Sequence, residues 1–469
     1  MAGHARPLHL ACLTMAGRDR RVRHIACLLM APLCMAAADY KAGIGRIVIT
    51  PEKPIYMSGY ASRNHPSEGV IHDLWAKALV IEDSKGGRVA IVTTDLIGLP
   101  RSLTDIVAAR VEKQYGIDRA QLVLNSSHTH TGPLIRHNLE TMFELGPEDS
   151  QVVTDYAAAL TEKLVAVVGA ALQDLAPANL SFGNGHATFA INRRQKTPRG
   201  VIIGEDPEGP TDPDVPVLKV TGTDGKLRAV LFGYACHNTT LTGEFYRISG
   251  DYAGFAQIAI EEGNPGATAM FMMLAGADQN PHPRSTLELA QQHGKELATE
   301  VNRVLGTKLA RVHGPVRGAF QIVELGFAPQ SREGFEARLH DKDVHRVRHA
   351  KAMLRLYDDG NPIRRYPYPV QAIQFGKDLT LVALGGEVVV DYVLRIKREY
   401  GSKGIMVAGY SNDVMSYIPS LRVLKEGGYE PDFSMIYYGL PGPYDEHVED
   451  QIMNTVHQVM KRVGRAAVQ

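Results

Sequence analysis

Cysteine is scarce in this 469-residue chain, and neither sign of charge is in excess. Three of the four cysteines, Cys12, Cys27 and Cys34, lie near the N-terminus, so Cys236 is the one cysteine in the remainder. A fold of that remainder held by internal disulfides is therefore excluded. Lys and Arg number 51, and Asp and Glu also number 51. Without a basic surplus to neutralise phosphates, the chain is not expected to be a dedicated nucleic-acid-binding protein.

Long apolar runs are also missing. After the first 38 residues, no run reaches the roughly 18 residues that a membrane-spanning helix needs, so no such helix is expected there. We find no internal repeat and no low-complexity tract. Hydrophobic residues make up 44% of the chain and charged residues 22%. This balance is typical of a globular protein that can bury a large core.

The N-terminal 38 residues have the pattern of an export signal. Arginines at 18, 20, 21 and 23 form a positive segment, residues 25–35 form a short apolar run, and residues 36–38 are three alanines that offer a cleavage site. The apolar run is about half the length that spans a bilayer, so a permanent anchor is the weaker interpretation. We expect residues 1–38 to be a signal peptide and the protein to be exported, periplasmic or secreted. The alternative is a misassigned start followed by a buried helix.

Helical and strand patterns alternate along residues 39–469. Hairpin patterns at 77–94, 217–234 and 370–384 are interleaved with amphipathic stretches such as 152–175. This order predicts an α/β fold with a mixed β-sheet core and flanking helices. The Pro/Gly-rich segments 199–216 and 360–369 are predicted to be loops rather than linkers. We therefore expect one large domain, although two closely packed lobes remain an alternative.

Several predicted strands end directly in clusters of polar residues. In α/β proteins the carboxyl ends of strands are where functional sites are assembled. If these ends share one rim, they form a single polar pocket. The clusters occupy residues 125–133, 237–238, 275–280, 385–387 and 410–413.

The histidines and one glutamate of these clusters suggest a metal site. His128 and His130 are two residues apart, so in extended chain both project to the same side. His237 and Glu387 would complete a set of imidazole and carboxylate groups with an open position, which is the pattern of catalytic zinc. A third histidine that is not bound to the metal could move a proton. The alternatives are polar loop histidines, a packed core histidine at 237, and a carboxylate that favours a helix N-terminus.

A basic pair follows another apolar strand, at Arg193 and Arg194. A guanidinium there could stabilise the oxyanion that develops during attack on a carbonyl. The alternative is a solvated turn that carries two basic residues.

Taken together, these motifs resemble the neutral/alkaline non-lysosomal ceramidase family. The segment SSHTHTGP at 126–133 is similar to the family's hallmark, and so are residues 42–45, 50–51 and 57–60. The order of the other motifs also follows the family over roughly residues 40–440. The resemblance implies that residues 39–469 are a single large catalytic domain. It also implies zinc-dependent hydrolysis of the N-acyl amide of ceramide, through a zinc-activated water, to a fatty acid and a sphingoid base.

The resemblance further implies roles for individual residues. The zinc ligands would be His128, His237, Glu387 and Tyr417. The histidine that assists catalysis would be His130. The remaining catalytic residues would be Arg193, which polarises the amide, and Tyr429, near the bond that is cut.

Two departures from the family pattern stand out. The family commonly carries a Ser-Pro-Asn segment where this chain has GADQNP at 276–281, without a serine. Substrate preference is therefore expected to differ. In addition, about 40 residues follow Tyr429. A separate C-terminal β-sandwich domain, as in the family, does not fit in that space and is not expected.

The sequence thus predicts an exported, zinc-dependent, ceramidase-like hydrolase of linear amides. Its expected partner is a lipid-like N-acyl amide substrate, with transient contact to a membrane surface as a possible addition and no nucleic acid. Two alternatives stay open. One is an exported metal-dependent hydrolase of a smaller polar amide or ester, and the other is a catalytically inactive relative that binds a ligand.

Overall fold

The computed structural model describes residues 38–468, so the expected signal peptide lies outside the described residues except for its last position. Strands and helices are mixed along the whole described range, as the sequence predicted. Residues Ala38–Gln469 form one compact unit. Within the described range, no helix has both the length and the apolar character to cross a membrane.

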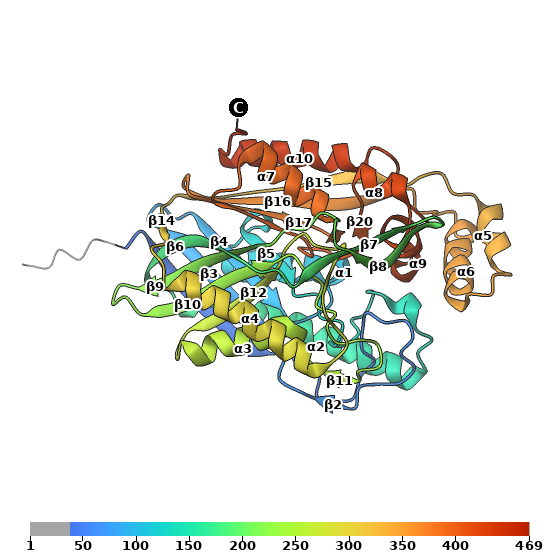
Figure 1. Ribbon diagram of the computed structural model, residues 1–469, viewed down its shortest axis with the longest axis horizontal. Helices are drawn as coiled ribbons and strands as arrows, with labels where there is room; N and C mark the ends of the chain where they lie inside the picture. The colour runs from blue at the N-terminus through green and yellow to red at the C-terminus, as the bar shows by residue number, and fades with distance from the viewer. Residues whose placement is uncertain (1–37, 469) are drawn as a thin grey trace, which may run out of the picture. The chain divides into compact units, whose positions relative to one another are not determined.

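The larger of the two main sheets has nine strands and is mixed (Figure 1). Its order is β12-β10-β9-β6-β1-β3-β4-β5, with β14 beside β6. Only β4 with β5 and β10 with β12 run parallel. The predicted hairpins at 77–94 and 217–234 are confirmed as β3–β4 and β9–β10. The strands are β1 (Tyr40–Val48), β3 (Trp75–Asp83), β4 (Arg88–Thr94), β5 (Leu122–Ser126), β6 (Ala176–His186), β9 (Asp214–Gly222), β10 (Leu227–Tyr234), β12 (Thr268–Met273) and β14 (Ala310–Val312).

The second sheet has four strands in the order β15-β16-β17-β19. The pair β16–β17 is the hairpin predicted at 370–384, and β17 runs parallel to β19. The strands are β15 (Val316–Gly326), β16 (Arg365–Phe375), β17 (Leu379–Leu384) and β19 (Ile405–Ala408).

The two sheets pack face to face, because one buried apolar cluster is built from strands of both. Leu79 and Leu231 contribute to it from the first sheet, and Leu381 and Met406 from the second. The opposite face of the first sheet is also apolar: Val80 belongs to a separate cluster shared with helices. Strands that are apolar on both faces are expected when layers cover both sides of a sheet.

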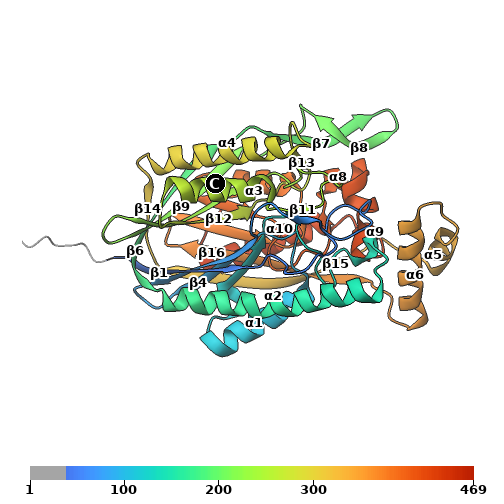
Figure 2. The same ribbon diagram turned by 90° about the horizontal axis from the view of Figure 1, so that it is seen from below.

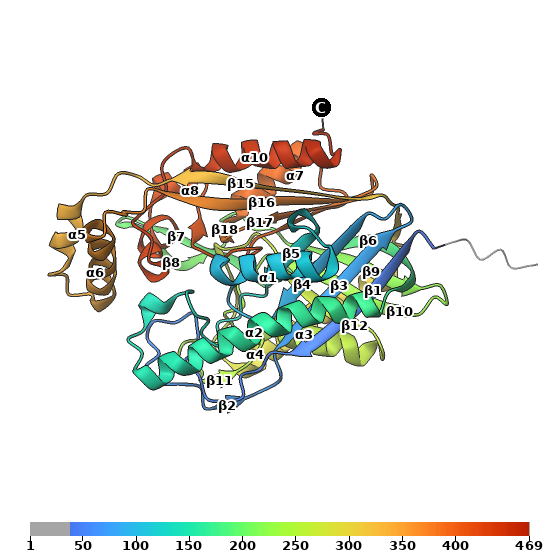
Figure 3. The ribbon, with the colours of Figure 1, turned by 180° about the vertical axis from the view of Figure 1, so that it is seen from behind.

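Helices cover the outer faces of both sheets, which gives four layers in the order α/β/β/α (Figures 1, 2 and 3). On the first sheet α2 packs on β1 and β3, and α3 packs on β12 with α4 beside it; on the second, α10 packs on β15 and β16. The predicted helix at 152–175 is α2, which begins earlier, at Pro147. The main helices are α1 (Arg101–Tyr115), α2 (Pro147–Gln173), α3 (Asp251–Gly263), α4 (Leu287–Leu305), α5 (Arg332–Arg338), α6 (Val344–Asp358), α7 (Val390–Tyr400) and α10 (Val448–Val463).

The prediction that residues 199–216 are a loop is wrong in part. Residues Gly200–Asp206 form β8, which pairs antiparallel with β7 (Ala190–Thr197). The β-branched run from Val201 to Ile203 favours a strand, and it outweighs the Pro and Gly residues around it. Likewise β16 already begins at Arg365, inside the second predicted loop. The short elements are β2 (Gly69–Val70), β11 (Arg247–Ile248), β13 (Gln279–Pro281), β18 (Glu387–Val388), β20 (Tyr417–Ile418), α8 (Leu421–Glu426) and α9 (Met435–Tyr438), with single turns at Arg119–Gln121, Glu140–Met142 and Tyr429–Phe433.

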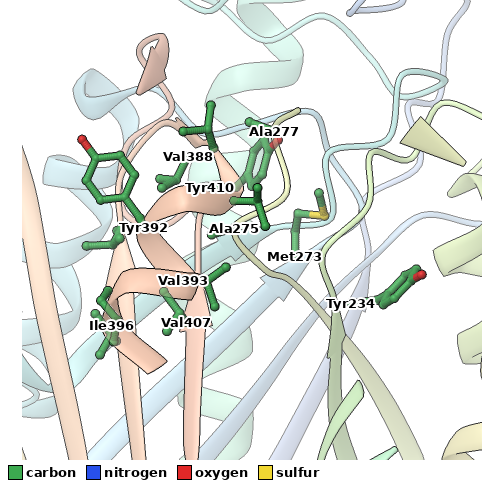
Figure 4. Packing of buried hydrophobic residues seen from close by; sticks show 14 of the residues in the cluster. Tyr234, Met273, Ala275, Ala277, Val388, Tyr392, Val393, Ile396, Val407 and Tyr410 are labelled. Atoms are coloured by element: carbon green, nitrogen blue, oxygen red, sulfur yellow. The ribbon is translucent and has the colours of Figure 1, made fainter. Parts of the chain in front are cut away.

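Asn125, at the end of β5, joins three strand ends. Its side-chain Nδ2 donates to the carbonyls of Met273 (3.2 Å) and Gly409 (2.8 Å), and its Oδ1 accepts from the amide of Met273 (2.9 Å). Since β5 and β12 are the two edges of the large sheet, this residue ties both edges to the end of β19. Figure 4 shows Met273, Ala275 and Tyr410 packed together at this junction. The polar strand ends are thereby brought to one place.

Candidate metal centre and active-site cavity

His128 lies in the loop that follows β5 and is fixed by two backbone contacts. Its amide donates to the carbonyl of Leu96 (2.8 Å), and its Nδ1 lies 2.6 Å from the carbonyl oxygen of Ile97. A carbonyl only accepts, so Nδ1 carries the proton and Nε2 keeps its lone pair. Its φ of 63° is in the left-handed region, which is uncommon for a residue other than glycine and frequent at functional sites.

His237 follows β10 and is fixed in the same way. Its amide donates to the carbonyl of Gln279 (2.9 Å), and its Nδ1 lies 3.4 Å from the carbonyl oxygen of Gly276. Nε2 therefore carries the lone pair here too. Burial, and then the nearby charge of Arg193, lower the pKa of His237 to about 3, so the imidazole is neutral at neutral pH. It is a packed histidine, but one whose free nitrogen points at other polar groups.

Glu387 is placed by a two-strand ladder. It opens β18, which runs parallel to β20, and its Cα partner in the register is Tyr417. The preceding Gly386 has φ +69°, and a Cβ there would lie 2.7 Å from the carbonyl oxygen of Ser416. Only glycine allows this close approach of the two chains. The alternative role of Glu387, a charge that favours the N-terminus of a helix, does not describe this geometry.

The carboxylate of Glu387 meets both imidazoles. Its Oε2 lies 3.0 Å from Nε2 of His128 and 3.1 Å from Nε2 of His237. Burial would raise the pKa of Glu387, but positive charge at the positions of His128 and then His237 outweighs that effect and holds the pKa well below its usual range. The hydroxyl of Tyr438 donates to the other oxygen, Oε1, at 2.5 Å. The carboxylate is therefore ionised and held from both sides.

This donor set fits a bound cation. Two lone-pair nitrogens face one ionised oxygen, and an arrangement of three acceptors needs a positive centre between them. In addition, both imidazoles donate Nδ1–H to backbone carbonyls, as metal-ligating histidines commonly do. Tyr417, the fourth predicted ligand, lies with its hydroxyl 3.3 Å from Nε2 of His237. Nitrogen and oxygen donors of this kind suit zinc.

His130 lies beside this set. Its Nε2 is 3.1 Å from Nε2 of His128, and the candidate ligand atoms of all three histidines lie within 4.8 Å of one another. Burial, followed by the other two histidines, lowers the pKa of His130 well below its usual range. The ring packs against Tyr60 with a centroid distance of 5.0 Å. Among the described residues, its Nδ1 has no hydrogen-bond partner.

Arg193 is buried next to the imidazoles and is not part of a solvated turn. Its Nε donates to Glu430 (2.9 Å), and its Nη1 lies 3.3 Å from Nε2 of His237. The guanidinium also lies over the rings of Tyr417 (5.3 Å) and Tyr429 (5.7 Å). Burial opposes its charge, but Tyr417 and Glu430 outweigh burial and raise the pKa of Arg193, so it stays a cation. Its buried Nη2 has no hydrogen-bond partner in the described part of the chain.

A cavity of about 230 Å³ reaches these groups. Four of the seven predicted site residues line it, while His128, His237 and Glu387 lie in the buried cluster that adjoins it. The lining residues are Gly59, Tyr60, Ala61, His130, Met142, Arg193, Ile203, Thr239, Asn280, Arg284, Tyr417, Tyr429 and Tyr437. The structure thus brings all seven predicted residues together, and the roles assigned to them stay predictions.

Some residues of the predicted polar clusters contribute structure rather than site groups. Asp278 accepts from the amide of Val390 (2.8 Å) and from Nδ2 of Asn192 (3.2 Å), so it ties α7 to β7. Asp413 accepts from the amide of Arg101 and from the hydroxyl of Tyr366. Neither carboxylate lines the cavity.

The sequence interpretation missed three groups that contact the predicted residues. Tyr410 donates to Glu387 at 3.4 Å and belongs to a strand end that was recognised, so its position was a usable indication. Glu430, the partner of Arg193, directly follows the predicted Tyr429 and could have been found in the same way. Tyr438 belongs to the four-residue helix α9, and no local pattern marks it.

Comparison with known proteins agrees with this arrangement. The family model described as "Neutral/alkaline non-lysosomal ceramidase, N-terminal" matches residues 40–282. The neutral ceramidase of Pseudomonas aeruginosa is 29% identical over 246 residues, which are 50% of this chain and 35% of that protein. The neutral ceramidase of Mycobacterium tuberculosis is 22% identical over 457 residues, which are 80% of this chain and 70% of that protein.

A solved structure shares the fold. The crystal structure of the Pseudomonas aeruginosa neutral ceramidase superposes with a TM-score of 0.71 at 21% identity, over 92% of this chain and 76% of that one. The match to the first curated relatives spans only about a third of their length. The family model covers more than half of this chain, including His128, His130, Arg193 and His237. The chain therefore belongs to the neutral/alkaline non-lysosomal ceramidase family, whose N-terminal model its residues 40–282 match.

Proposed function

We propose that the protein is a zinc-dependent amidohydrolase that cleaves the N-acyl amide bond of ceramide-like lipids to a fatty acid and a sphingoid base. One observation carries this proposal. The lone-pair nitrogens of His128 and His237 converge on the ionised carboxylate of Glu387 at 3.0 and 3.1 Å, beside the cavity that His130, Arg193 and Tyr417 line. His128, His237, Glu387 and Tyr417 would hold the ion. When bound, zinc would supply a Lewis acid and lower the pKa of water to about 7.

Arg193 is placed to bind the acyl oxygen of the substrate. It is a buried cation, it lines the cavity, and its Nη2 has no hydrogen-bond partner among the described groups. Its Nε and Nη1 are held by Glu430 and the imidazole of His237, so the guanidinium is fixed before substrate arrives. A fixed donor of this kind stabilises the charge that develops on the oxygen without having to reorganise. Burial raises the pKa of Tyr429, so its hydroxyl remains a second donor in the cavity.

His130 is placed to transfer the proton. Its imidazole is neutral at neutral pH, lines the cavity and carries Nε2 on the same side as the candidate ligand atoms. We assign this Nε2 as the base that accepts a proton from the attacking water and returns it to the leaving amine. Such transfers contribute about 10²- to 10⁴-fold to the rate.

The proposal is tested by incubating the purified, zinc-loaded protein with a panel of N-acyl amides that includes ceramides, and by identifying the released amine by mass. We expect the release of a free sphingoid base. This release should stop after chelation and resume when zinc is restored. Cleavage of small polar amides alone would favour the alternative hydrolase. Zinc binding without any cleavage would favour the inactive, ligand-binding relative.

Export is part of the same proposal and rests on the sequence of residues 1–38 alone. Expression of the full chain in a Gram-negative host, followed by N-terminal sequencing of the periplasmic protein, tests it. The expected first residue is Asp39. A periplasmic fraction without the protein, with uncleaved chain in the cytoplasm, would contradict export.

A further inference from the structure

We infer that the cavity contains a binding site for an anionic group of the substrate, formed by Arg284. The enzyme would then favour N-acyl amides that carry a carboxylate or a phosphate near the amide. This inference rests on the proposed amide hydrolysis and names the substrate class within it. In each case water adds its oxygen to the acyl carbon, the C–N bond breaks, and the amine leaves with the proton.

Arg284 lines the same cavity as Arg193, but its charge is not neutralised in the same way. Arg193 is paired with Glu430 at 2.9 Å. Within the described range, by contrast, no ion pair joins Arg284 to a carboxylate, and its buried Nε has no hydrogen-bond partner. The nearby carboxylate of Asp251 does not form an ion pair with Arg284. It is buried and accepts from the amides of Leu241 and Tyr252 instead. The guanidinium therefore keeps donors available for a ligand.

The residues that line the cavity leave it positive. They include two arginines, several tyrosines, Asn280 and Thr239, and no aspartate or glutamate among the residues described. Ala61, Met142 and Ile203 and the tyrosine rings supply the apolar part of the wall. An arginine without a carboxylate partner in such a wall attracts an anion. An arginine fork also matches the geometry of carboxylate and phosphate oxygens.

The side chain of Arg284 is held in place before any ligand binds. Its Nη2 donates to the hydroxyl of Tyr60 (2.9 Å), and that hydroxyl in turn donates to the carbonyl of Leu241 (3.1 Å). The ring of Tyr60 packs on His130, which connects the proposed site to the catalytic groups. A held arginine loses little freedom on binding, and this favours recognition of a charged group.

The backbone around Arg284 is anchored on both sides. The carbonyl of Pro283 accepts from Nε2 of His293 (2.7 Å), and the amide of Ser285 donates to the carbonyl of Thr240 (2.7 Å). Arg284 follows the segment that lacks the family's serine, so the altered segment leads directly into the proposed site. The departure predicted to change substrate preference thus coincides with an unpaired cation in the cavity.

The experiment compares substrates that differ in charge and hardly in shape. With the zinc-loaded full chain, we measure kcat/KM for N-lauroylglycine against N-lauroylglycinamide, and for N-lauroyl-O-phosphoethanolamine against N-lauroylethanolamine. We expect kcat/KM to be about tenfold or more higher for the anionic member of at least one pair. The pair that shows the preference tells whether the site favours a carboxylate or a phosphate. In Arg284→Gln that preference should fall to within about twofold through a higher KM for the anion.

Two further variants control the result. Arg284→Lys keeps the charge without the fork and should retain part of the preference, even if the glutamine variant folds poorly. Arg303→Gln removes an exposed arginine on α4 and should leave every ratio unchanged. No preference in the wild type, or the same preference in Arg284→Gln, overturns the inference while leaving the proposed function intact. If no amide of any kind is cleaved, the proposed function fails and the inference falls with it.

Discussion

Nε2 of His237 lies 3.1 Å from Oε2 of Glu387, although the two residues are 150 positions apart in the chain. His237 follows β10 of the nine-stranded sheet, and Glu387 follows β17 of the second sheet. The contact therefore exists only when the two sheets have packed. Metal binding is expected to be coupled to folding for the same reason, since the ligands are not assembled in the unfolded chain.

Tyr438→Phe should weaken metal binding without removing a proposed ligand. The hydroxyl of Tyr438 donates to Oε1 of Glu387 and so orients the carboxylate. Loss of a group that orients a metal ligand typically costs about 10- to 100-fold in affinity. The measurement is competition for zinc with a chelator of known affinity. Tyr400→Phe, at the far end of α7, is the control and should bind zinc as the wild type does. Equal zinc affinity in the two variants would show that Tyr438 does not support the site.

Arg193→Met should lower kcat about 10²- to 10³-fold, because the donor for the acyl oxygen is lost. Zinc content should stay unchanged. Arg194→Met is a matched control, since Arg194 also binds Glu430 but does not line the cavity. That variant should lose stability while retaining kcat within a few-fold. If the two variants lose kcat equally, the effect comes from the buried Glu430 rather than from contact with substrate.

Gly59→Ala should slow turnover while the metal stays bound. A Cβ at this position would lie 2.4 Å from Nδ1 of His130, and the φ of +97° is strained for alanine. The imidazole of His130 would have to move, and a displaced base transfers protons less well. We expect kcat to fall at least about tenfold. His130→Ala should lower kcat as well. Turnover at the wild-type rate in His130→Ala, or loss of zinc from it, would contradict its assignment as the base.

Asp413 should make folding stability depend on pH. Burial raises its pKa to about 7, and the hydrogen bonds from Tyr366 and Arg101 do not offset that rise. The native state therefore binds more protons than the unfolded state between about pH 4 and pH 7, so this group's contribution to stability falls as pH rises through that window. Denaturant unfolding of wild type and Asp413→Asn from pH 5 to 8 tests this. The free energy of unfolding of the wild type minus that of Asp413→Asn should shrink toward pH 7 and then level off. A difference that is constant from pH 5 to 8 would contradict the raised pKa of Asp413.

Local patterns predicted much of the fold. The hairpins β3–β4, β9–β10 and β16–β17 and the helix α2 follow from periodicity within single segments. The polar strand ends at His128, His237 and Glu387 were visible for the same reason. The β8 strand was missed because its Pro- and Gly-rich surroundings suggested a loop.

Contacts between distant segments could not be predicted in this way. Tyr438 reaches Glu387 from a short helix 51 residues further along the chain, and Asn125 joins strand ends from both sheets. Such contacts depend on how the layers pack, and periodicity within one segment does not encode that. Tyr417 stood just after a polar strand end, and the resemblance to a family assigned it the role of a ligand. Tyr429 came from the resemblance alone, since no residue pattern marked it.

The most direct test is the zinc content of the purified chain, measured by elemental mass spectrometry for wild type, His128→Ala and His237→Ala. We predict about one zinc per wild-type chain, and loss of both zinc and amide hydrolysis in each variant. A His237→Ala protein that is folded and carries as much zinc as the wild type, with undiminished turnover, would contradict the proposed metal centre.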